Sequence, residues 1–228
     1  MSALGDVLQF DVDDLDEGVA DRVRVLVNEL KPNELRDRVR FLITEMPWDY
    51  PVDEQLEFEE RGKRQVEAVE TLVRDLLAQP DELHAVLPQL SVGDQRMTVA
   101  AGHAIAKFSV NPQEWGVIIE RAIEEAPAGN RNFGLVTGYY AAMSSIDAAF
   151  VEAFKRRSVT SPVIAPALPL VCSHIGVSAS DVSLVIDALR LGTVTPSATS
   201  FWTMGARSPG CPCWKWHHYL ISCSPWTA

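Results

Sequence analysis

The chain has 228 residues, of which 47% are hydrophobic and 22% charged, so it can build a sizeable core and wholesale disorder is excluded. Its net charge of −11 is uneven, because residues 1–130 hold 27 acidic and 13 basic side chains. Such an acidic half repels a phosphate backbone and disfavours nucleic acid as a partner. The first residues lack the basic and apolar parts of an export signal, and no apolar stretch reaches the ~20 residues that span a bilayer. We therefore expect a cytoplasmic protein with no membrane segment.

Residues 1–16 are acidic, and we expect them to be flexible. Residues 17–90 predict a region of irregular helices, which begins with two helices of the same apolar spacing separated by Lys31-Pro32-Asn33. Their expected inward residues are Val19, Val23, Leu26, Val27 and Leu30 in the first helix, and Leu35, Val39, Leu42, Ile43 and Met46 in the second. A longer helix is expected from Asp53 to Ala78, and residues 80–90 predict a short helix or a turn.

Residues 91–206 carry regularly spaced signals for the start of a helix. A polar N-cap residue followed three positions later by an acid occurs at Asn111-x-x-Glu114, Ser144-x-x-Asp147 and Ser178-x-x-Asp181, with spacings of 33 and 34 residues. Helices between them are expected at Ser161-Pro162 and Thr195-Pro196, 34 residues apart, because proline suits the first helical position. The predicted inward stripes are Trp115, Ile118 and Ala122, then Ile146, Phe150 and Phe154, then Val182, Ile186 and Leu189. A helical hairpin every ~34 residues is typical of an α-solenoid.

In this spacing and size pattern, residues 93–205 resemble HEAT-like α-helical repeats, and residues 19–90 do so more loosely. The resemblance implies an all-α fold of stacked antiparallel helical hairpins, an α-solenoid, that binds a protein or peptide. The tetratricopeptide and ankyrin consensus sequences are absent, and a non-repetitive helical bundle is the alternative fold.

No motif for a catalytic site or a cofactor is present: a P-loop, a dinucleotide-binding glycine pattern, a nucleophile elbow and an H-E-x-x-H helix are all missing. The acidic cluster near the N-terminus resembles the D-x-D strand end of haloacid-dehalogenase-type phosphotransferases, but helices follow it where that family has a sheet. It consists of Asp11, Asp13, Asp14, Asp16 and Glu17. We favour the interpretation that these acids solvate the terminus and stabilise the start of the first helix. A metal-dependent phosphotransferase-like enzyme is the alternative.

Several single residues have an unremarkable interpretation in the same pattern. The scattered histidines His84, His103 and His174 are expected at interfaces or at the edge of the core, and Cys172 is expected to be buried and reduced. Phe133, Tyr139 and Tyr140, together with Trp115, are expected in the core of the repeats. Arg131 and the run Lys155–Arg157 predict either a basic patch for an acidic partner or, as we favour, a solvated helix end.

Residues 207–228 form an atypical tail, RSPGCPCWKWHHYLISCSPWTA, with three cysteines, three tryptophans and two histidines. Cys211, Cys213, Cys223 and either His217 or His218 are candidate zinc ligands, although their spacing does not match the usual zinc frame. We favour a segment that was not selected to fold with the body, out of frame or disordered, and the alternative is a hydrophobic cap. The interpretation of the whole chain is a non-enzymatic interaction or scaffold module, such as the repeat portion of a larger protein. A structural subunit that associates with itself through its C-terminal end is a further alternative.

Overall fold

The computed structural model describes residues 15–29, 32–46 and 57–199. Within these ranges the regular elements are helices, which confirms an all-α chain, and extended backbone pairs there only as an isolated bridge between Val92 and Arg131. The helices are α2 (Glu17–Glu29), α3 (Leu35–Val39) with the π-helical turn η2 (Arg40–Thr44), α4 (Phe58–Leu77), α5 (Pro80–Leu90), α6 (Thr98–Phe108), α7 (Pro112–Glu125), α8 (Gly134–Ile146), α9 (Ala148–Ser158), the 3₁₀ turn η3 (Ala165–Ala167), α10 (Leu168–Ile175), α11 (Ala179–Leu191) and the 3₁₀ turn η4 (Pro196–Thr199). In this part of the chain no helix combines the length and the apolar character that crossing a bilayer requires.

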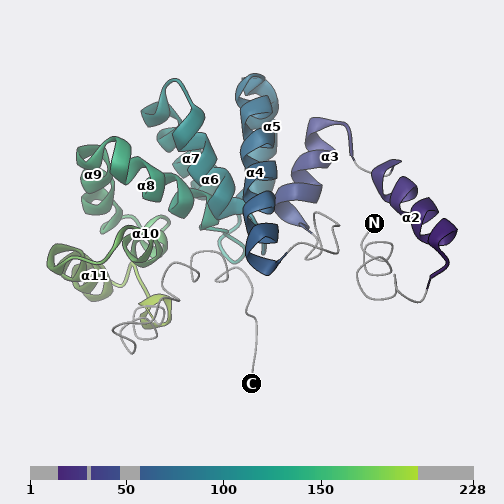
Figure 1. Cartoon of the computed structure of the whole chain (residues 1–228). Coiled ribbons are helices and arrows are strands. Elements are labelled where there is room, and N and C mark those ends of the chain that lie inside the picture. Colours follow the sequence, from purple (N-terminus) through teal and green to yellow (C-terminus); the bar gives the residue numbers. More distant parts are fainter. Residues whose placement is uncertain (1–14, 30–31, 47–56, 200–228) are drawn as a thin grey trace.

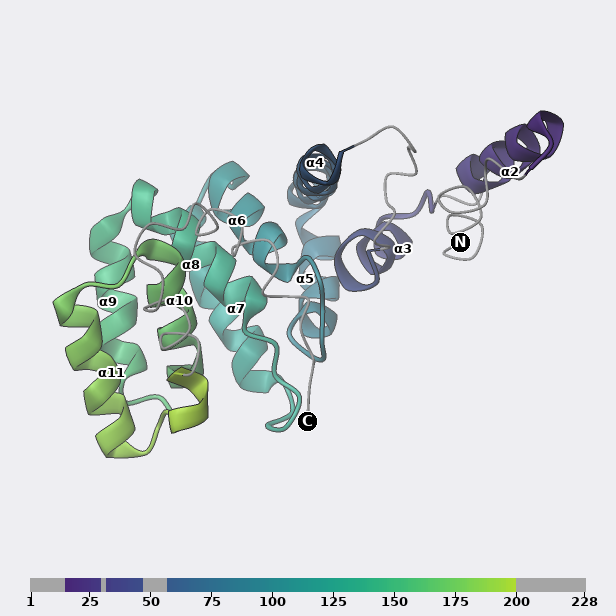
Figure 2. The ribbon, with the colours of Figure 1, turned by 60° about the horizontal axis from the view of Figure 1, so that its bottom comes forward.

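Successive helices pair as α4 with α5, α6 with α7, α8 with α9, and α10 with α11. The first helices of these pairs contact one another in the order α4, α6, α8 and α10, and the second helices touch at α5–α7 and at α9–α11. The helices therefore follow one another across the molecule in chain order, from α2 at one end to α10 and α11 at the other (Figures 1 and 2).

One continuous core runs through most of the molecule, from Val39 in α3 to Val171 in α10. Its largest fully buried side chains include Tyr139, Tyr140 and Phe154, all of which were expected to point inward. A second, smaller cluster packs α10 against α11 and contains Cys172, which is buried and unpaired as expected. Trp115 is 8% exposed and joins the main core, while Phe133 packs against its edge.

Two glycines let α6 and α8 approach backbone to backbone. A Cβ atom added to Gly138 would lie 1.9 Å from the carbonyl oxygen of Val99, and one added to Gly102 would lie 2.0 Å from that of Leu135. Because no carbon atom fits at such distances, only glycine permits this contact between the two helices. The central hairpins thus meet through their main chains.

The helix starts differ in part from those expected. The capping box at Ser178 and Asp181 is formed, but Asn111 makes no side-chain cap and α7 simply begins at Pro112. Ser144 lies inside α8 and donates to the carbonyl oxygen of Ala141 at 2.7 Å. The cap of α9 is Asp147 instead, whose carboxylate accepts from the N–H of Phe150 at 3.0 Å. The second helices start at Pro112, Ala148 and Ala179, so their spacing is 36 and then 31 residues.

The helices expected at Ser161-Pro162 and Thr195-Pro196 are shorter than expected. After Ser161 the chain turns, and α10 begins only at Leu168, because Pro166 and Pro169 lack the N–H groups that a longer helix would use. At Thr195 the described chain forms only the turn η4. The long helix expected from residue 53 begins at Phe58 in the described part, and residues 80–90 are a helix.

Three of the expected inward stripes are wrong in part. In the stripe of Ile146, Phe150 and Phe154, Ile146 is 52% exposed, whereas Phe154 is fully buried. In α11 the buried residues are Asp181, Val185 and Ala188, whereas Val182 and Ile186 are 39% and 41% exposed. The helix is rotated because Asp181 turns inward to an ion pair with Lys155. In α2, Val19 and Leu26 are 44% and 46% exposed, since no neighbouring element of the described chain covers this side of the helix.

Candidate functional site

A pocket of about 550 Å³ opens where the turn between α4 and α5 meets the turn between α6 and α7. Its volume lies within the roughly 300–1,000 Å³ of sites that take small ligands or side chains. The residues that line it are Arg74, Leu77, Ala78, Pro80, His84, Phe108, Ser109, Val110, Asn111, Glu114, Trp115 and Ile118. Because α4 contacts α6 and α5 contacts α7, the pocket marks the junction of two neighbouring hairpins.

One wall of the pocket is a pair of aromatic rings. The ring of His84 lies over that of Trp115, with centroids 5.0 Å apart and planes 33° from parallel. Nδ1 of His84 lies 2.7 Å from the carbonyl oxygen of Pro80. Since a carbonyl oxygen can only accept, Nδ1 carries a proton and donates it in this hydrogen bond. Sequence reasoning placed this histidine at an interface, and here it borders the junction between α5 and α7.

A second wall carries positive charge over an aromatic ring. The guanidinium of Arg74 lies 4.0 Å from the ring centroid of Phe108, and Nζ of Lys107 lies 4.8 Å from the same centroid. A single carboxylate serves both cations, because Glu70 lies 2.8 Å from Lys107 and 3.6 Å from Arg74. Two positive charges and one negative charge therefore meet around Phe108, which lines the pocket together with Arg74.

Val110, in the turn before α7, is 94% exposed. It directly precedes the N-cap residue Asn111, a position at which an apolar side chain often packs against the fourth residue of the helix. That fourth residue is Trp115, whose side chain is buried in the main core. With so much of its surface in solvent, Val110 gains little from packing, and it presents an apolar group at the rim of the pocket.

The remaining charged group of the pocket is Glu114, an exposed side chain in the first turn of α7. The positive end of the helix stabilises its negative charge, so this carboxylate has a favourable environment without a cation beside it. Together the lining supplies apolar and aromatic walls, one guanidinium, one carboxylate and one imidazole. This set suits the binding of an amphipathic group.

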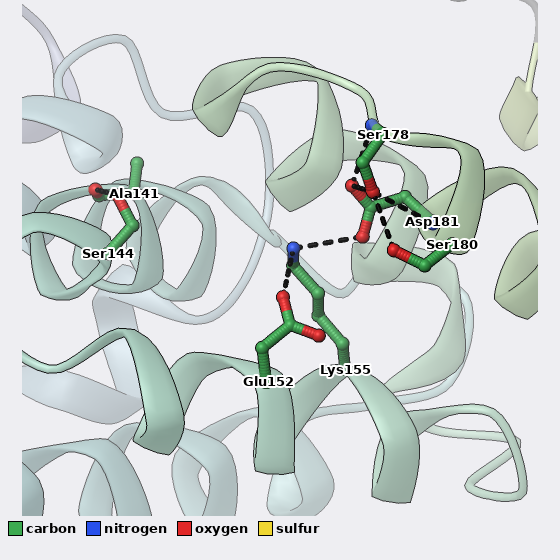
Figure 3. A network of polar contacts seen from close by, with 7 residues as sticks. All are labelled: Ala141, Ser144, Glu152, Lys155, Ser178, Ser180 and Asp181. Carbon is green, nitrogen blue, oxygen red and sulfur yellow. Dashed lines mark hydrogen bonds and ion pairs between the residues drawn. The ribbon is translucent and has the colours of Figure 1, made fainter.

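A separate polar cluster ties α9 to α11 around the buried side chains of Lys155 and Asp181 (Figure 3). Nζ of Lys155 lies 2.9 Å from Oδ1 of Asp181 and 2.8 Å from Oε1 of Glu152, although the side chain of Lys155 is only 5% exposed. The other carboxylate oxygen of Asp181 accepts from the N–H and the hydroxyl of Ser178 at 2.9 and 2.7 Å. Asp181 therefore caps α11 and pairs with α9 at the same time.

The electrostatics of this cluster keep the ion pair charged. Burial acts to raise the pKa of Asp181, but hydrogen bonds from Lys155 and Ser178 outweigh it and the pKa lies below its usual value. Burial likewise acts to lower the pKa of Lys155, and its bonds to Glu152 and Asp181 outweigh this and raise it. Nearby, burial and then the charge of Asp181 raise the pKa of the Cys172 thiol to about 12. A thiol held protonated in this way is a poor nucleophile, so the cluster is a structural tie.

The expectation that Lys155–Arg157 is a solvated helix end is wrong for the buried Lys155, whereas Arg156 and Arg157 are exposed. Arg157 pairs with Glu120 of α7, and Tyr140 of α8 donates its hydroxyl proton to the same carboxylate. Burial, followed by the charge of Glu120, raises the pKa of Tyr140 far above its usual range, so the phenol stays protonated. Arg131, also considered for a basic patch, donates to the carbonyl oxygens of Ile123 and Ala126 at 3.1 Å.

The candidate zinc ligands Cys211, Cys213, His217, His218 and Cys223 lie outside the described residues, as do Asp11, Asp13 and Asp14. Asp16 is described, and its carboxylate accepts from the N–H of Gly18 at 2.9 Å at the start of α2. This contact agrees with a role at the helix N-terminus.

The described part of the chain holds no group of three or more metal-ligating side chains. His103 on α6 is exposed, and His174 contacts the carbonyl oxygen of Leu170 through Nδ1 at 3.0 Å.

Sequence reasoning did not find the pocket. Arg74 reads as an ordinary helix charge, and its contact with Phe108 depends on the packing of α4 on α6. One signal was available, since an apolar residue directly before the N-cap Asn111 is expected to have a packing partner. No protein-family model matches the chain, and comparisons with curated proteins and with solved structures give no match either.

Proposed function

We propose that this chain is a non-enzymatic interaction module, a HEAT-like α-solenoid that binds a protein or peptide at the pocket between its α4–α5 and α6–α7 hairpins. The cytoplasmic location expected from the sequence is part of the proposal. Separate observations support the architecture and the site.

Support for the solenoid arrangement comes from side-chain contacts that recur at nearly one repeat length. Three hydrogen bonds join residues 34 positions apart, and they link Thr98 to Asn132, Gln113 to Asp147, and Thr193 to Val159. Three ion pairs join residues 37 positions apart, and they link Arg38 to Asp75, Lys107 to Glu70, and Arg157 to Glu120. Contacts of similar spacing between successive units are what a stack of repeats produces, because each unit touches mainly its neighbours.

The single observation that carries the proposed site is the exposure of Val110 beside an aromatic pocket. An apolar side chain that is 94% exposed at a well-ordered turn contributes little to folding, and it borders the apolar surface of Leu77, Ile118 and Trp115. Exposed apolar surface beside a pocket is typical of sites where another protein docks. The charged groups in its lining then orient the partner.

The test compares Val110→Glu with a matched control, Val177→Glu. Val177 also directly precedes an N-cap residue, Ser178 of α11, and it is 43% exposed, so both changes place the same charge before the second helix of a hairpin. The full-length chain and both variants are used as bait in an extract of the native cells, and bound proteins are quantified by mass spectrometry.

We expect a set of bound proteins that Val110→Glu loses and Val177→Glu retains. The same proteins bound to both variants, or none above the bare matrix, would contradict the proposal. Circular dichroism spectra of both variants should match that of the unaltered chain, because neither valine is buried.

A further inference from the structure

We infer that the pocket receives a peptide segment in which a bulky apolar side chain lies next to an aspartate or glutamate, and that Arg74 binds this carboxylate. The inference rests on the proposed function and adds the chemistry of the partner. It depends on three features of the pocket: the contacts of Arg74, the negative charge of Glu114, and the apolar residues of the lining.

Arg74 is held in place and shares its paired carboxylate with Lys107. Its guanidinium lies 4.0 Å from the centroid of the Phe108 ring, and its side chain is still 53% exposed. The only carboxylate paired with it among the described residues, Glu70, is 3.6 Å away and lies closer to Lys107, at 2.8 Å. A guanidinium over an aromatic face keeps the N–H groups at its rim available, and these match the two oxygens of a carboxylate.

Glu114, at the start of α7, does not need a positive charge from the partner. The positive end of that helix stabilises its carboxylate, so no cation from a partner is required there. Its negative charge instead repels an acidic group from that side of the pocket. Arg74 and Glu114 thus favour one orientation of a partner that carries an apolar side chain and a single acid.

The apolar walls of the pocket determine which side chain of the partner segment lies next to its acid. Leu77, Ile118 and Trp115 line the same pocket as the two charged groups, and the volume of about 550 Å³ accommodates a large side chain such as leucine, phenylalanine or tryptophan. No glycine lines the pocket, so no glycine-rich loop of backbone N–H groups is present to receive a free C-terminal carboxylate. We therefore commit to a side-chain carboxylate within the partner's chain.

The charge of the whole chain restricts the motif further. Residues 1–130, which include the pocket, carry 27 acidic and 13 basic side chains, and this excess repels a strongly acidic segment. The partner segment should therefore hold one acid in an otherwise neutral or basic stretch.

The probe for the test is a library of random linear peptides displayed on phage, fused through their C-termini so that only side-chain carboxylates are offered. The library is selected on the full-length chain, on Arg74→Gln, and on Val110→Glu, with Val177→Glu as control. We expect the unaltered chain and Val177→Glu to select a bulky apolar residue next to Asp or Glu. Arg74→Gln should keep the apolar preference and lose the acidic one.

A synthetic copy of the selected peptide gives the magnitude. It should bind Arg74→Gln about tenfold or more weakly, because a charged hydrogen-bonded pair is lost. A peptide with Gln in place of its acid should show the same loss on the unaltered chain and no further loss on Arg74→Gln.

The outcomes separate the two proposals. If Val110→Glu loses the peptides but Arg74→Gln binds them as tightly as the unaltered chain does, the inference is overturned and the proposed function stands. A requirement for a free C-terminal carboxylate in synthetic peptides has the same consequence. Peptides that bind Val110→Glu as well as the unaltered chain place binding elsewhere and overturn both. A library from which nothing is enriched overturns the inference, and the experiment with native extract then decides the proposed function.

Discussion

The close contact of α6 and α8 makes Gly138→Ala the sharpest test of the fold. Gly138 lies in the middle of α8, where a new Cβ atom would sit 1.9 Å from the carbonyl oxygen and 2.7 Å from the carbonyl carbon of Val99. Carbon and oxygen atoms normally approach no closer than ~3.3 Å. The two helices would have to move apart by more than about 1 Å, and they lie in the main core.

The size of the effect follows from two opposed terms. Forcing one extra methyl group into a packed interior costs roughly 1–3 kcal/mol and sometimes more. Alanine in a helix is favoured over glycine by about 1 kcal/mol, which offsets part of this cost. Because the contact is with rigid backbone, we expect the upper end of the range and a net loss of about 2 kcal/mol. For a chain of this length that loss lowers the melting temperature by roughly 4–8 °C.

The matched control is Gly62→Ala in α4, where an added Cβ atom has nothing within 4 Å. There the same substitution only removes the flexibility of glycine, and it should stabilise the protein by about 0.5–1 kcal/mol. Urea denaturation followed by circular dichroism measures both variants. A Gly138→Ala protein as stable as the unaltered chain, or more stable, would refute the backbone contact between α6 and α8.

Three further predictions concern the buried cluster at the C-terminal end of the described chain. Lys155→Met leaves Asp181 charged and unpaired inside the protein and should cost about 3–5 kcal/mol in urea denaturation; a loss below ~1 kcal/mol would show that the pair is solvated. Burial raises the pKa of Asp181, but the bonds from Lys155 and Ser178 lower it more, so the pKa is lower in the folded chain than in the unfolded chain. The contribution of Asp181 to stability is therefore complete above the unfolded pKa of ~3.9 and is lost as the pH falls through the lower folded pKa. Asp181→Asn should therefore remove part of the fall in stability below about pH 4, and an unchanged acid profile would contradict this. Cys172, with its pKa raised to about 12, should resist iodoacetamide at mildly alkaline pH in the folded chain and react in urea, as peptide mapping by mass spectrometry would show.

The sequence was informative where the determinants of structure are local. Ser178 and Asp181 are three residues apart and form the expected capping box, and the apolar pattern of α3 identifies its buried face. Ser144 was misplaced because Asp147, the other half of the same motif, is itself a good N-cap residue and wins the competition. Both readings fit the same local pattern, and packing decides between them.

Long-range features could not be predicted. The inward rotation of α11 depends on Lys155, which lies on another helix and looks like part of a solvated basic run. Similarly, Gly102 and Gly138 read as weak positions in two separate helices until their backbones meet. The pocket combines α4, α5 and the turn before α7, so its lining exists only once two hairpins have packed.

Site-specific photocrosslinking tests the proposed docking site most directly. A benzophenone amino acid is placed at Val110 or at Val177 of the full-length chain, which is expressed in its native cells and irradiated. Val110 borders the pocket and Val177 occupies the corresponding position of another hairpin, away from the pocket lining. The account predicts a discrete partner adduct from position 110 that is lost when Arg74→Gln is added, and no such adduct from position 177. No adduct from position 110, or equal adducts from both positions, would contradict it.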